Sequence, residues 1–102
     1  MYKLVITELA HQDLDSIVSY IAVQLSNPKA AGDFIDEVTV CYGFLKSNPM
    51  MYERCQDRRL GEEGYRKAVI KNYVLVYKIN EASKIVSIMR FFYGAQDYTK
   101  LI

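Results

Sequence analysis

The sequence predicts a single α+β domain, residues 1–102, in which an antiparallel sheet carries two N-terminal helices on one face. The length is close to the commonest size of a single domain. Apolar residues recur every three or four positions in the first half, and β-branched and aromatic runs fill the second half. Helices followed by a run of strands are typical of α+β domains, so the expected order of elements is β-α-α-β-β-β.

A short strand and a capped helix are expected at the start of the chain. The run YKLVI at 2–6 is rich in residues that favour strands. Thr7 follows it, and its hydroxyl can accept a hydrogen bond from a free backbone N–H of the first helical turn. The apolar stripe of this helix comprises Ala10, Leu14, Ile17, Val18, Ile21 and Leu25.

A second helix is expected between two copies of the tripeptide Ser-Asn-Pro, at 26–28 and 47–49. Asn27 suits the N-cap, and Pro28 suits the first helical position, where its missing N–H costs no hydrogen bond. The apolar stripe of this helix comprises Ala31, Phe34, Ile35, Val38, Tyr42 and Leu45. The short connection between the two helices predicts an antiparallel pair.

Three strands are expected after a polar loop at 47–64. The runs YRKAVI at 65–70 and YVLVYKI at 73–79 are separated only by Lys71 and Asn72, which predicts a hairpin. The turn NEAS at 80–83 leads to a last strand, KIVSIMRFF at 84–92, and a short helical turn follows.

Charge is divided unevenly along the chain, although the net charge is only +1. Residues 1–53 carry a net charge of −4, and residues 54–78 carry a net charge of +4. Such a division can mark a surface that binds a polyanion. It can equally reflect two oppositely charged surfaces that keep the protein soluble.

A cytoplasmic protein is expected. No apolar run approaches the roughly 20 residues that cross a bilayer, and the N-terminus lacks the basic and apolar regions of a signal peptide. The two cysteines, Cys41 and Cys55, form no CxxC pair and are expected to be reduced thiols.

The motifs of several enzyme classes are absent from the sequence: GxxxxGK[ST], GxGxxG, HExxH and GxSxG. The only histidine, His11, lies on the first helix and is expected to be solvated. Asp33, Asp36 and Glu37 share a helix face without a neighbouring histidine, which favours solvated surface over a metal site. We therefore expect neither a metal ion nor a small-molecule cofactor.

Cationic and phenolic side chains gather on the three late strands. Because side chains alternate along a strand, Lys67 is expected on one face with Tyr65, and Arg66 on the other. The same alternation places Arg90 on one face with Val86, Ile88 and Phe92. Such side chains can pair with phosphates, stack on bases and stabilise the transition state of metal-free RNA cleavage. The alternative is that the aromatics are core or sheet-edge residues and that the cations form an ordinary solvated face.

The run GYRKAVIKNYVLVYKINEASKIVSIMRFFYGAQDYTKLI, at 64–102, resembles the C-terminal half of the RelE/ParE superfamily of toxins from bacterial type II toxin–antitoxin modules. The resemblance extends over the whole chain, including the opening strand and the two helices with their Ser-Asn-Pro break. It implies the RelE/ParE-like fold and one of two activities. RelE-like members cut mRNA in the ribosomal A site without a metal, and ParE-like members inhibit DNA gyrase.

The nuclease pattern of the superfamily is kept only in part. Lys67 matches a basic position on its strand, but Val74 stands where RelE-like members have an arginine. Ala95 and Gln96 replace the basic pair that usually follows the glycine of the last strand. Since loss of one such cation costs about 10²–10³-fold in rate, the departures favour a ParE-like growth inhibitor.

If the chain is a nuclease nevertheless, the resemblance implies roles for two tyrosines. Tyr93 occupies an aromatic or histidine position before the glycine, and Tyr98 can stand in for a C-terminal catalytic tyrosine. The candidate catalytic residues are then Lys67, Arg66, Arg90, Tyr93 and Tyr98.

The resemblance also implies a cognate antitoxin whose tail wraps the toxin. The residues expected to bind an acidic antitoxin segment or a nucleic acid are Arg58, Arg59, Arg66, Lys67, Lys71 and Lys78. The implied target is DNA gyrase or, in the alternative, the ribosome and its mRNA. A third possibility is a decayed toxin that serves only as a partner of the antitoxin.

Overall fold

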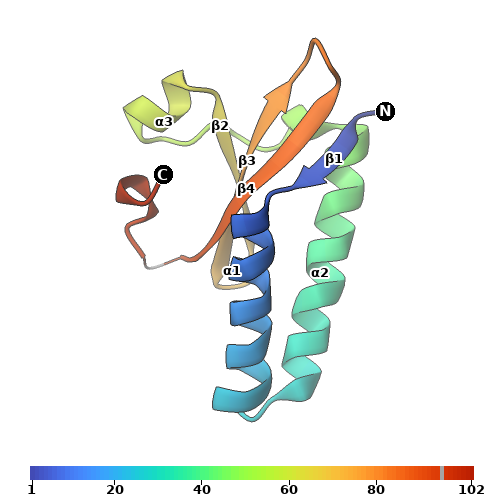
Figure 1. The fold of residues 1–102 in the computed structure, drawn as a ribbon, viewed down its shortest axis with the longest axis vertical. Helices are drawn as coiled ribbons and strands as arrows, with labels where there is room; N and C mark the ends of the chain where they lie inside the picture. Colours follow the sequence, from blue (N-terminus) through green and yellow to red (C-terminus); the bar gives the residue numbers. More distant parts are fainter. Residues whose placement is uncertain (95) are drawn as a thin grey trace.

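The computed structural model describes residues 1–94 and 96–102. The strands within these residues form one sheet, and Figure 1 shows them with the helices. The strands are β1 (Lys3–Ile6), β2 (Tyr65–Ile70), β3 (Tyr73–Asn80) and β4 (Ile85–Tyr93). The α-helices are α1 (Glu8–Ser19), α2 (Pro28–Ser47) and α3 (Arg58–Glu62). A π-helical turn at Tyr20–Gln24 extends α1, and 3-10 turns lie at Pro49–Met51 and Tyr98–Lys100. None of these helices is long and apolar enough to cross a membrane.

The strand order in the sheet is β1-β4-β3-β2. β2, β3 and β4 pair antiparallel, as predicted. β1 pairs with β4 in parallel, so the prediction of a purely antiparallel sheet is wrong for this edge strand. The reason is that β1 connects to the other strands through two helices. A long crossover allows a parallel pairing that a tight turn forbids.

The predicted helix starts are confirmed. Thr7 Oγ1 accepts a hydrogen bond from the backbone N–H of Ala10 at 3.2 Å, and Asn27 Oδ1 accepts one from Ala30 at 3.1 Å. Pro28 occupies the first turn of α2. The two long helices lie side by side and extend past one end of the sheet (Figure 1). Local hydrogen bonds thus define where each helix begins.

The inner core lies between the two long helices and one face of the sheet. Its fully buried residues are Ala10, Phe34, Leu45, Leu75, Tyr77, Val86 and Ile88. The predicted stripe of α2 is wrong at Ile35, which is 43% exposed, whereas Cys41 is buried. Cys41 lies seven residues after Phe34, which is about two helical turns, and therefore lies on the same side of the helix. Ile35 directly follows Phe34, and its side chain is rotated about the helix axis away from the core.

A β-bulge in β4 changes which face the later residues occupy. The register between β3 and β4 shifts by one residue and leaves Met89 unpaired. Val86 and Ile88 are buried in the inner core. The extra residue moves Arg90 and Phe92 to the opposite face of the sheet. The prediction that Arg90 shares a face with Val86 and Ile88 is therefore wrong, because strict alternation fails at a bulge.

The outer face of the sheet is covered by a second apolar cluster, which we call the outer cluster. Its buried members are Cys55, Leu60, Val74, Val76 and Phe92, against which Tyr65, Tyr98 and Ile102 pack. The prediction of a polar loop at 47–64 is wrong for α3, which Asp57 caps by accepting from the N–H of Leu60 at 3.1 Å. Figure 1 shows α3 beside the C-terminal turn, away from the two long helices. A five-residue helix with one buried leucine is too short to show a period.

Gly61→Ala is expected to destabilise the protein by about 1–3 kcal/mol, the usual cost of overpacking. A Cβ at Gly61 would lie 2.6 Å from the carbonyl oxygen of Cys55, so the backbone of α3 must shift. Urea unfolding measures the change. The matched control is Gly43→Ala in α2, where a Cβ meets no atom within 4 Å. It should be neutral or stabilising, because alanine favours helix by up to about 1 kcal/mol over glycine. Equal effects of the two substitutions would contradict the close approach.

Candidate functional site

A pocket of about 360 Å³ opens between the β2–β3 turn and the end of β4. We call it the Lys67 pocket. Its lining comprises Lys67, Val69, Lys71, Asn72, Tyr73, Val74, Tyr93, Gly94 and Tyr98. The structure thus brings together Lys67, Tyr93 and Tyr98 from the candidate catalytic residues. Arg66 and Arg90 do not line this pocket.

The β2–β3 turn forms one wall of the Lys67 pocket. Lys71 has a left-handed backbone conformation with φ of 53°, and its ammonium pairs with Glu37 of α2 at 3.5 Å. The N–H of Gly94 donates to the carbonyl oxygen of Asn72 at 2.7 Å. A Cβ at Gly94 would lie only 3.0 Å from that oxygen, so glycine permits the close approach of the turn to the end of β4.

Lys67 lies beside an aromatic stack. Its ammonium is 6.0 Å from the centroid of the Tyr98 ring. Tyr98 stacks on Phe92, with the ring centroids 5.7 Å apart and 22° between the ring planes. Lys67 forms no ion pair within residues 1–94 and 96–102. Its charge can therefore attract a phosphate or a carboxylate of a partner without first breaking an internal ion pair.

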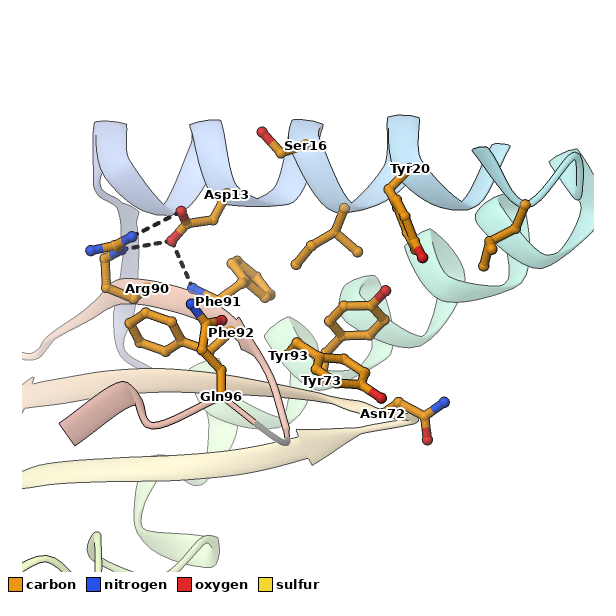
Figure 2. A pocket seen from close by; sticks show the side chains of 12 residues that line it. Asp13, Ser16, Tyr20, Asn72, Tyr73, Arg90, Phe91, Phe92, Tyr93 and Gln96 are labelled. Carbon is orange, nitrogen blue, oxygen red and sulfur yellow. Dashed lines mark hydrogen bonds and ion pairs between the residues drawn. The ribbon is translucent and has the colours of Figure 1, made fainter. Parts of the chain in front are cut away.

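Arg90 forms an ion pair with Asp13 of α1, as Figure 2 shows. Its Nε donates to Asp13 Oδ2 at 2.7 Å and its Nη2 to Asp13 Oδ1 at 3.2 Å. The same carboxylate accepts from the backbone N–H of Phe91 at 3.0 Å. The hydrogen bond that Arg90 donates to Asp13 raises the pKa of Arg90, although burial opposes the shift. Two donors of this guanidinium are thus already used inside the protein.

Arg66 faces away from Lys67, as the alternation along β2 predicts. It pairs across the strands with Tyr77 of the inner core, whereas Lys67 pairs with Val76 of the outer cluster. Arg66 Nη1 donates to the carbonyl oxygen of Tyr52 at 2.6 Å. This contact supports the segment that precedes α3 and directs the guanidinium to a backbone carbonyl.

The remaining candidate binding residues also contact groups of the protein itself. Arg58 pairs with Glu62 at 3.0 Å on the exposed side of α3. Lys78 lies 4.5 Å from the centroid of the Tyr65 ring. Arg59 contacts the C-terminal segment through two main-chain oxygens. The single exposed contacts of Arg58 and Lys78 contribute little energy and can be exchanged for contacts with a partner.

A larger cavity, of about 590 Å³, lies beside α1. We call it the aromatic groove. Its lining comprises Asp13, Ser16, Ile17, Tyr20, Leu25, Asn72, Tyr73, Arg90, Phe91, Phe92, Tyr93 and Gln96. Figure 2 places the Asp13–Arg90 pair at one end and Tyr20 toward the other. Of the substituted pair after the last strand, Gln96 lines this groove and Ala95 lies outside the described residues.

Tyr20 and Asp13 are among the residues of the aromatic groove that were not candidate site residues from the sequence. Tyr20 follows Ile17 by three positions, so its place on the apolar stripe was a usable signal. Asp13 gave no signal, because an acidic residue on a helix is ordinarily solvated.

No group of three or more His, Cys, Asp or Glu side chains in the described part of the chain is arranged to hold a metal ion. Asp33 instead pairs with Lys29 at 3.0 Å on the surface of α2.

The family model described as the ParE toxin of type II toxin–antitoxin systems, parDE, matches residues 4–98. No curated protein matches the chain. A solved structure of the chromosomal ParDE toxin–antitoxin system from P. aeruginosa is similar, with 20% identity, a TM-score of 0.72, and coverage of 91% of this chain and 96% of that chain. The RelBE2 toxin–antitoxin complex from Mycobacterium tuberculosis is also similar, at 20% identity, a TM-score of 0.63, and coverage of 90% and 96%. YafQ from E. coli gives 15% identity, a TM-score of 0.61, and coverage of 93% and 96%.

These solved structures share the fold of this chain: a four-stranded sheet with helices packed on one face. The family model adds what fold similarity alone cannot, because it matches the sequence from β1 to the turn that contains Tyr98. The resemblance to the RelE/ParE superfamily is thereby confirmed. This chain belongs to the ParE toxin family of type II toxin–antitoxin systems.

Proposed function

We propose that this toxin arrests growth by binding DNA gyrase and not by cutting RNA. The observation that carries the proposal is that both candidate catalytic arginines hold partners inside the protein. Arg90 is bound to Asp13 through two hydrogen bonds, and Arg66 is bound to the carbonyl of Tyr52. The match to the ParE family model supports the same choice.

A metal-independent nuclease depends on cations that stabilise the charge developing on the phosphate. Loss of one such donor costs about 10²–10³-fold in rate. At the Lys67 pocket, Lys71 is paired with Glu37, and Val74 is uncharged where RelE-like members are basic. The remaining set is better suited to hold a partner than to cleave a phosphodiester. The alternative, RelE-like mRNA cleavage, is favoured by the presence of Lys67, Tyr93 and Tyr98 in one pocket.

A cognate antitoxin is the second partner that we propose. The similar structures from P. aeruginosa and M. tuberculosis are described as toxin–antitoxin assemblies. An acidic antitoxin segment would complement the net charge of +4 on residues 54–78. Lys67 is a suitable contact for it, because this lysine holds no ion pair in the described structure.

Pulse-labelling after tightly controlled induction in bacteria without the antitoxin tests the target. Early loss of DNA synthesis, together with inhibition of purified gyrase in a supercoiling assay, is the expected result. Early loss of protein synthesis with RNA cleavage would instead establish the RelE-like alternative. If neither synthesis falls while the protein is folded, the chain is a decayed toxin that only binds antitoxin.

Lys67→Glu is expected to reduce toxicity by at least about tenfold, measured as colony survival after induction, since a reversed charge at an interface costs about 1.4 kcal/mol or more. The matched control is Lys29→Glu, which makes the same charge change on the exposed face of α2. It should leave toxicity unchanged. Circular dichroism verifies that both variants fold. Equal toxicity of the two variants would mean that the Lys67 pocket does not contact the target of the toxin.

A further inference from the structure

Arg59 of α3 fastens the segment 98–102 to the rest of the protein. Its Nη2 donates to the main-chain oxygens of Thr99 and Ile102, each at 2.8 Å, and its Nη1 pairs with Glu63 at 3.4 Å. A guanidinium is planar and presents its N–H groups in a rigid fork, so one arginine can hold two carbonyls at once. Figure 1 shows α3 and this segment next to each other, as the contacts require.

The fastened segment packs on the outer cluster. Tyr98 and Ile102 lie against its buried members, and Leu60, which follows Arg59 in α3, is fully buried in it. The segment is therefore held at two places: by Arg59 on α3 and by the stack of Tyr98 on Phe92. The same stack sets the Tyr98 ring beside the Lys67 ammonium.

We propose that Arg59 is a positioning residue of the toxin. It holds the segment 98–102 over the outer face of the sheet and thereby keeps Tyr98 as a wall of the Lys67 pocket. The sequence suggested a different role for Arg59, as one of several cations that bind an acidic partner. The inference rests on the proposed function in one respect, namely that the Lys67 pocket is the surface that the toxin uses.

The two cysteines provide a test within one molecule. Cys55 belongs to the outer cluster, and Cys41 is buried in the inner core. Burial raises the pKa of both thiols, so both react slowly while they are covered. In Arg59→Ala, alkylation of Cys55 by iodoacetamide is expected to become at least about tenfold faster, because the substitution removes both hydrogen bonds that the guanidinium donates to the segment. Alkylation of Cys41, followed by peptide mass spectrometry, should not change.

Arg58→Ala is the matched control, because Arg58 is the adjacent arginine of α3 and its ion pair with Glu62 is exposed. It should alter neither alkylation rate. An unchanged rate at Cys55 in Arg59→Ala would overturn the proposal. A parallel rise at Cys55 and Cys41 would also overturn it, because that result means general unfolding and not local release of the segment.

A second measurement reports on the segment directly. The chain has no tryptophan, so Tyr98→Trp introduces a single tryptophan at the stack on Phe92, and its emission can be excited apart from that of the tyrosines. Adding Arg59→Ala should shift its emission to the red and increase quenching by acrylamide. Unchanged spectra would contradict the claim that Arg59 holds the segment 98–102 in place. If the segment 98–102 is released but Arg59→Ala remains fully toxic, Arg59 is still a positioning residue, and the Lys67 pocket is not the surface that binds the target.

Discussion

Replacing Asp13 with alanine is expected to lower the free energy of unfolding by about 2–4 kcal/mol, slightly below the cost of breaking a fully buried ion pair. The side chains of Arg90 and Asp13 are 25% and 18% exposed, so the unpaired guanidinium is only partly hydrated. The substitution also removes the acceptor of the Phe91 N–H. β1 pairs with β4 only as far as Ile88, and beyond that point Asp13 supplies the acceptor for the Phe91 N–H.

Urea unfolding followed by circular dichroism measures this loss. Asp33→Ala is the control, because the Lys29–Asp33 pair is exposed on α2 and is expected to contribute less than about 0.5 kcal/mol. Removing both charges of the partly buried pair, with Asp13→Ala and Arg90→Met together, should recover part of the loss. If Asp13→Ala costs no more than Asp33→Ala, Asp13 is not needed to hold α1 on β4.

Leu60→Ala is expected to destabilise the protein by about 2–4 kcal/mol, as is usual for a fully buried leucine. Leu60 is 0% exposed and fills the outer cluster between α3 and the sheet. Its truncation leaves a cavity beside Val74 and Val76. The strand that carries both residues, β3, cannot move to close it, since β3 is paired on both sides. Thermal or urea unfolding measures the effect.

Leu9→Ala provides the comparison for this prediction. Leu9 lies on α1 and is 55% exposed, so its replacement should change stability by less than about 0.5 kcal/mol. A cost for Leu60→Ala as small as that for Leu9→Ala would show that the outer cluster adds no stability to the domain.

The elements that the sequence predicted correctly depend on neighbouring residues. Thr7 and Asn27 cap helices through bonds to residues three positions further along, and Lys71 and Asn72 form the turn that joins β2 to β3. Each of these interactions is complete within a few positions of the chain. The corresponding patterns are therefore readable without knowledge of the fold.

The candidate site was readable only in part. Lys67, Tyr93 and Tyr98 do line one pocket, although 31 positions separate Lys67 from Tyr98. The engagement of Arg90 was not readable, because its partner Asp13 is 77 positions away and the bulge before Arg90 leaves no mark in the alternation. Their roles in toxicity remain predictions.

The sequence by itself determined the order of the strands and of the two long helices, the limits of these helices, the faces of β2 and the toxin superfamily. Only the tertiary structure decided which cations hold partners inside the protein, and that the outer face of the sheet is covered as well as the inner face. α3 is too short to have a readable period, yet it buries Leu60 and holds the segment 98–102 through Arg59. The physical reason is that capping and periodicity act within a few residues. Ion pairing and the cover of a sheet face instead depend on segments brought together by folding.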